Sequence, residues 1–335
     1  MTTSATDAAA VAGGAPAPRV RIFGWGNLAL MAAFVANTVL MFWFDWPGIG
    51  PIYPGTDGST ALAAVQAAIY FGLPALAIYY VIATGDRTLR HDAQTVSDAN
   101  AFFIRAAFWA VFLIGIADTV VSAIRAEGML ESLFGDELAV DLGRSAFRGL
   151  WVHVPALLIG VGIAAVTRTL GFFWLSLMVV AAELLIVFSR FVFSYEQPYM
   201  ADLVRFWYAA LFLFASAYTL LDDGHVRVDV LYAGFRRRTR GKVNSLGSVL
   251  LGMTMCWAIL FVGMWTNSSI IVSPILVFET TQTGFGMYVK YFMAGFLGVF
   301  GISMMVQFVS YMFESLADWR EEPGGRALDS AGPVG

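Results

Sequence analysis

The chain has 335 residues, of which 59% are hydrophobic and only 13% are charged, whereas a soluble domain usually carries about 25% charged residues. This composition excludes an ordinary water-soluble globular protein. The single cysteine, Cys256, excludes an internal disulfide framework and a cysteine-rich metal site. The net charge of −4 predicts little by itself, because the placement of Lys and Arg carries the information in a membrane protein.

Residues 1–20 predict a disordered cytoplasmic tail, because the segment up to Pro18 is rich in Ala, Gly, Ser, Thr and Pro. Arg19 and Arg21 then precede an apolar stretch that is long enough to cross a bilayer. A signal peptide would place positive charge ahead of a shorter apolar region and a cleavage site. We therefore expect an uncleaved first helix.

Apolar runs of about 20 residues recur along the chain, and a helix of that length crosses a hydrocarbon core of roughly 30 Å. The runs are apolar on every face, unlike the alternating short segments of a β-barrel. The sequence therefore predicts an all-α polytopic membrane protein. Its eight expected spans are residues 25–44, 61–83, 102–124, 149–166, 171–193, 203–221, 245–265 and 287–313.

The distribution of Lys and Arg predicts that both termini are cytoplasmic. In that topology only Arg125, Arg144 and Arg148 fall in outer loops, and thirteen of the 20 Lys and Arg residues fall in inner segments. The same topology divides the chain into an N-terminal four-helix extension, residues 21–168, and a second four-helix unit, residues 169–318. Residues 319–335 are expected to form a disordered cytoplasmic tail.

The segment from Tyr218 to Lys242 combines a turn with an amphipathic pattern. Asp222, Asp223 and Gly224 have the chemistry of a turn. Apolar residues then recur at helical spacing, and they are followed by the basic cluster Arg236, Arg237, Arg238 and Arg240. This pattern predicts an interfacial helix near residues 228–240 that binds anionic lipid head groups.

Charged residues within spans are costly and are candidates for function by default. Asp118 lies in the third span with Arg125 seven residues later, and Glu183 lies in the fifth with Arg190 seven residues later. Each pair shares one face of its helix. We expect structural pairing, within a face or across neighbouring helices, because an ion path needs several aligned polar groups and none is evident.

Several kinds of chemistry lack their motifs. The chain has no G-x-x-x-x-G-K-[ST] phosphate loop. Of its three histidines only His153 lies in an expected span, which excludes a bis-histidine haem buried within the chain. We therefore predict no catalytic, cofactor or metal site, and we expect membrane lipids but no nucleic acid as partners.

A resemblance adds to this interpretation. Tyr218-Thr219-Leu220 followed by His225-Val226-Arg227-Val228-Asp229 resembles the signature of the DctQ-type small permease subunits of tripartite ATP-independent periplasmic (TRAP) transporters. In that family the second motif lies between the second and third of four helices. Glu279, Gly284 and Lys290 also resemble the family's last outer loop, although the proline that often follows the acidic residue is absent.

The resemblance implies a non-catalytic subunit in the bacterial inner membrane. It would brace a large permease subunit, which holds the solute and sodium sites, while a periplasmic binding protein delivers an organic acid. His225, Arg227 and Asp229 would then form an assembly motif. Two alternatives remain at this point: a membrane anchor of a redox complex, and an independent small transporter. The resemblance extends over about Gly171 to Trp319, and the first 170 residues lie outside it and have no assigned role.

Overall fold

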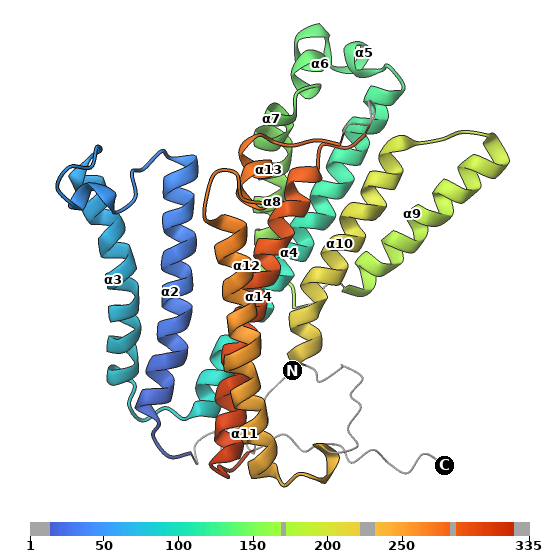
Figure 1. The fold of residues 1–335 in the computed structure, drawn as a ribbon. Helices are drawn as coiled ribbons and strands as arrows, with labels where there is room; N and C mark the ends of the chain where they lie inside the picture. The colour runs from blue at the N-terminus through green and yellow to red at the C-terminus, as the bar shows by residue number, and fades with distance from the viewer. Residues whose placement is uncertain (1–13, 169–171, 222–231, 282–285, 325–335) are drawn as a thin grey trace, which may run out of the picture. The chain divides into compact units, whose positions relative to one another are not determined.

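The computed structural model describes residues 14–168, 172–221, 232–281 and 286–324, and every regular element in these ranges is a helix. The long elements are α2 (Pro18–Trp43), α3 (Thr60–Ala83), α4 (Leu89–Ala126), α8 (Val154–Val166), α9 (Phe172–Phe193), α10 (Pro198–Leu221), α11 (Arg237–Gly247), α12 (Thr254–Met264) and α14 (Lys290–Trp319) (Figure 1). The short elements are η1 (Gly50–Ile52), α5 (Leu130–Phe134), α6 (Asp136–Leu142), α7 (Ser145–Arg148), η2 (Gly149–His153), η3 (Tyr232–Gly234), η4 (Ser248–Met253) and α13 (Val272–Leu276).

Eight helical segments in the described ranges are long and apolar enough to cross a membrane. This confirms the predicted all-α, multi-span fold. The largest difference is the start of α4, which begins at Leu89 instead of near residue 102. Its first turns carry buried polar side chains, among them Arg90, Asp92 and Asn100. A search for apolar runs misses these turns, because they carry polar side chains that pack inside the protein.

The basic cluster lies in a different element from the one predicted. Arg236 is the extended N-cap of α11, and the helix begins at Arg237. It continues through the π-helical turn η4 into α12, so that Arg237–Met264 forms one candidate span. Arg237, Arg238 and Arg240 therefore open the seventh long helix and do not end a separate interfacial helix. Of the predicted interfacial segment, residues 228–231 lie outside the described ranges.

The chain forms two compact units. The first contains Met1–Asp98, His225–Met255 and Met305–Gly335, and the second contains Ala99–Gly224 and Cys256–Met304. Each unit takes residues from both sides of the boundary that the sequence predicts near Arg168. Helices α4 and α14 each contribute one part to each unit.

In the first unit, α2 and α3 form an antiparallel pair (Figure 1). The buried amide of Asn37 on α2 donates to the carbonyl of Gln66 on α3 at 3.3 Å. Helix α11 packs closely on α14, because a Cβ added to Gly241 would lie 2.5 Å from the backbone nitrogen of Trp319. Small residues at such positions allow helix backbones to approach each other.

The second unit has an aromatic core. Phe206 and Phe214 of α10 contact Phe296 of α14 with ring centroids 5.1 and 5.0 Å apart, and Phe108 of α4 contacts Phe214 at 5.5 Å. Such edge and tilted arrangements stabilise aromatic pairs beyond the burial of their area. In contrast, most side chains along α9 are exposed. This helix therefore lies at the margin of its unit.

Candidate functional site

A buried ion pair lies in the second unit. The Asp118 carboxylate on α4 lies 3.0 Å from Arg148 Nη1 on α7, and both side chains are 0% exposed. Arg148 also donates to the Ser122 hydroxyl at 3.0 Å and to the Leu142 carbonyl at 2.6 Å. The sequence placed Arg125 on the same helix face as Asp118, but the structure pairs Asp118 with Arg148.

The turn η2 adds a histidine to this pair. His153 Nε2 lies 3.1 Å from Asp118 Oδ1, and its Nδ1 lies 2.6 Å from the hydroxyl of Tyr291. The wide π-helical turn over Gly149–His153 sets this orientation, and π-turns occur often at functional positions. Close packing favours glycine at its start, because a Cβ there would lie 2.4 Å from the ring of Phe278.

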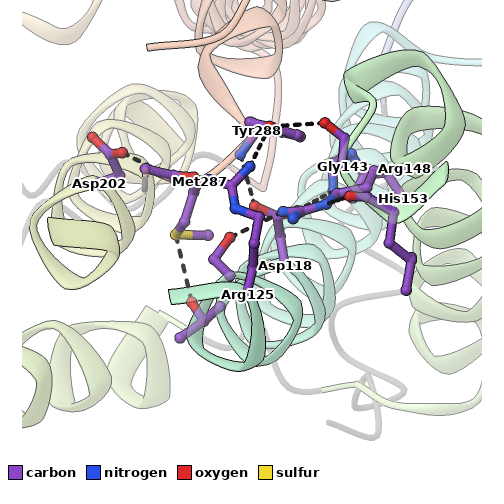
Figure 2. Close-up of polar contacts among 12 residues, drawn as sticks. Asp118, Arg125, Gly143, Arg148, His153, Asp202, Met287 and Tyr288 are labelled. Carbon is purple, nitrogen blue, oxygen red and sulfur yellow. Dashed lines mark hydrogen bonds and ion pairs between the residues drawn. The ribbon is translucent and has the colours of Figure 1, made fainter. Parts of the chain in front are cut away.

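The charged side chains of Asp118, Arg125 and Arg148 all contact Tyr288, which lies just before the start of α14 (Figure 2). The Tyr288 amide donates to Asp118 Oδ2 at 2.8 Å, and the Tyr288 hydroxyl donates to the Gly143 carbonyl at 2.9 Å. The Arg148 guanidinium lies 4.3 Å from the centroid of the Tyr288 ring. Arg125 lies 4.6 Å from that centroid, bonds the Tyr288 hydroxyl and donates to the Gly286 carbonyl at 2.9 Å.

We call this group the Asp118 cluster: Asp118, Arg125, Arg148, His153, Tyr288 and Tyr291. A buried charge is tolerated only when it is paired and hydrogen-bonded. Asp118 meets this condition with donors from Arg148, His153 and the Tyr288 amide. The adjacent Met287 amide donates to a second buried carboxylate, Asp202 of α10, at 3.0 Å. Two carboxylates therefore anchor successive amides of one segment.

A second group of charges lies in the first unit. Arg90 of α4 pairs with Glu314 and, at 2.7 Å, with Asp318, both on α14. Arg237 at the start of α11 lies 2.7 Å from the same Asp318 carboxylate. We call these four residues the Arg90 cluster. The Asp318 carboxylate offsets the positive charge of Arg237, because a cation at a helix N-terminus is otherwise unfavourable.

A third charged group connects helices within the N-terminal half. Arg21 Nε of α2 lies 2.6 Å from Asp92 of α4, and both side chains are buried. Arg21 also donates to the carbonyl of Thr84, just after α3, at 2.5 Å, and the Trp25 indole donates to Asp92 at 2.9 Å. The sequence counted Arg21 only as one positive charge beside a span, and nothing local to it indicates this buried role.

Glu183 and Arg190 share one face of α9, as the sequence predicts, but the structure does not pair them. Arg190 lies 3.4 Å from Glu196, and both side chains are largely exposed. Glu183 is exposed near the middle of α9 and has no hydrogen-bond or ion-pair partner among the residues that the structure describes. Lys290 pairs with Glu279 at 2.5 Å. His225, Arg227, Asp229 and Gly284 lie outside the described ranges.

The C-terminal half of the chain is similar to a known protein family. Residues 177–318 match the family described as "Tripartite ATP-independent periplasmic transporters, DctQ component". This part of the chain is similar to the DctQ component of these transporters. The match and the eight candidate spans indicate a multi-pass protein of the inner membrane. No curated protein and no solved structure matches the chain significantly.

The Asp118 cluster and the Arg90 cluster each contain residues from inside and from outside the DctQ match, residues 177–318. Tyr288, Tyr291, Glu314 and Asp318 belong to the DctQ part, and Asp118, Arg148, His153 and Arg90 precede it. Each cluster therefore connects residues that precede the DctQ match to residues within it. The sequence drew attention to Asp118 but not to this connection, because the residues that meet there are up to 228 positions apart.

Proposed function

We propose that this chain is the small permease subunit that braces the large permease subunit of a TRAP transporter during sodium-coupled, binding-protein-dependent import of an organic acid. The observation that supports the proposal best is the DctQ match over residues 177–318. The large permease would hold the solute and sodium sites, and a periplasmic solute-binding protein would deliver the solute. We propose the topology that the positive-inside rule predicts, with both termini in the cytoplasm.

We further propose that the extension, residues 21–168, fastens the DctQ part internally. The support is the pair of charged clusters, each of which has one side in the extension and one side in residues 177–318. A brace must resist deformation while its partner moves, and hydrogen-bonded ion pairs such as Asp118–Arg148 add rigidity to the packing between helices. The basic residues Arg236 and Arg238 would bind anionic lipid head groups at the cytoplasmic surface.

Reconstitution tests the proposed function. Proteoliposomes that contain this chain and the large permease should accumulate a labelled organic acid when the binding protein and an inward sodium gradient are both supplied. Omission of the binding protein, the gradient or the large permease should each abolish uptake. Sodium-driven uptake by this chain alone would show that it is itself the transporter and would overturn the brace.

The assembly motif gives a separate prediction. Arg227→Ala or Asp229→Ala should reduce the amount of large permease that co-purifies with the subunit about tenfold, which corresponds to about 1.4 kcal/mol of binding free energy. The matched control is Arg238→Ala, because Arg236, Arg237 and Arg240 retain the local charge. Quantitative blotting of the purified complex measures the effect. Equally small effects of all three changes would remove the special role of the motif.

A further inference from the structure

Glu183 has an unusual environment. It lies near the middle of α9, in a candidate membrane span that runs over Phe173–Phe193, and its side chain is exposed. The side chains next to it on the same side of the helix are apolar and outward-facing, and Leu184 and Phe191 are 64% and 80% exposed. The chain thus carries a carboxylate on an otherwise apolar surface at mid-membrane depth.

Such a position is costly in lipid. Acyl chains offer no hydrogen-bond donor, and acidic residues within membrane helices almost always pair or face the interior of a helix bundle. A long Lys or Arg side chain reaches the interface from near a helix end. The short Glu183 side chain cannot do so from the middle of a helix of 22 residues.

Among the described residues, none satisfies this carboxylate. Arg190, two turns further along the same face, pairs with Glu196. Asp118 and Asp202, the other acidic residues of long helices in this unit, are both buried and accept backbone amides at 2.8 and 3.0 Å. Glu183 differs from them because no donor reaches it from the described residues. A donor from another molecule would remove the cost of this unpaired carboxylate.

Resting on the proposed function, we infer that the face of α9 formed by Val180, Glu183, Leu184, Val187 and Phe191 seats a membrane-spanning helix of the large permease subunit. That helix presents a hydrogen-bond donor or a cation to Glu183 within the membrane. Charge complementarity selects this occupant over lipid tails, which have no donor. It also selects it over a second copy of the chain, because a two-fold interface on this face would bring two Glu183 carboxylates together.

Site-specific photocrosslinking in the assembled transporter tests the inference. A benzophenone amino acid at Val187 should form an adduct with the large permease, identified by mass spectrometry, in native membranes. The matched control is the same amino acid at Leu185, which is 48% exposed at similar depth but on the opposite side of α9. An adduct with a second copy, with lipid alone, or equally strong at both positions would overturn the inference.

Substitution of the carboxylate gives a second readout. Glu183→Leu should lower the amount of large permease that co-purifies roughly tenfold, and Glu183→Gln should lower it less, because the amide still hydrogen-bonds. Leu185→Ala should leave co-purification unchanged. Undiminished complex with Glu183→Leu would overturn this inference alone. If the unmodified subunit failed to co-purify with a large permease, the proposed function and this inference would both be overturned.

Discussion

Asp118→Leu is expected to lower the free energy of unfolding by about 3–5 kcal/mol, because removal of one partner leaves the other charge buried and uncompensated. Arg148 would remain at a site that is 0% exposed, and the Tyr288 amide and His153 would also lose their acceptor. Thermal unfolding in detergent, followed by tryptophan fluorescence, measures the loss. A smaller fraction of monodisperse protein should accompany it.

Two further variants separate charge burial from general damage to the fold. Asp118→Leu combined with Arg148→Met should be more stable than Asp118→Leu alone, because the double change removes both charges from the low-dielectric site. Arg144→Ala breaks the pair with Asp141, in which Arg144 is 67% exposed, and should cost only about 0–1 kcal/mol. If Asp118→Leu were as mild as Arg144→Ala, the Asp118 cluster would not stabilise the fold.

Gly160→Leu is expected to destabilise the second unit by about 3 kcal/mol or more, at the upper end of the usual cost of overpacking. A Cβ at Gly160 of α8 would lie 2.5 Å from the backbone nitrogen of Ala110 on α4. A backbone atom inside a helix cannot move aside as a flexible side chain can. The two helices would have to separate, and the same assay of thermal unfolding would report the loss.

Gly162 supplies the matched control for Gly160. It lies on the same helix, and a Cβ there would meet nothing within 4 Å. Gly162→Leu should therefore change the free energy of unfolding by no more than about 0.5 kcal/mol, as is usual for surface positions. Equal melting temperatures for the two variants would contradict the close contact between α8 and α4.

Changes at Asp118 and Gly160 test how residues ahead of the DctQ match contribute to the fold. Asp118, Arg148 and Gly160 all precede the matched residues 177–318, yet the Asp118 cluster holds the segment that leads into α14. If the extension fastens this segment, destabilising changes at Asp118 should also weaken assembly with the large permease. The motif variants Arg227→Ala and Asp229→Ala are expected to weaken assembly without this loss of stability.

Residue spacing predicted the intramembrane pairs only in part. Asp118 and Arg125 share a helix face seven residues apart, but Arg125 contacts Tyr288 and Gly286 instead. The short helices α5 and α6 follow Asp118 in the sequence and turn the chain back. Arg148, which comes after them, can therefore contact Asp118 on α4. Glu183 and Arg190 share a face as well, yet the turn after α9 brings Glu196 to Arg190. Spacing along one helix cannot show which neighbour a folded loop will supply.

The sequence by itself determined the number and type of spans, because the hydrophobic length needed to cross a bilayer is a local property of about 20 consecutive residues. It also indicated the family, through the motif from His225 to Asp229. Only the tertiary structure decided which charges are buried together, where α4 and α11 begin, and that Glu183 is left without a donor within the described chain. These features depend on contacts between residues far apart in sequence, and such contacts follow from helix packing and not from local composition.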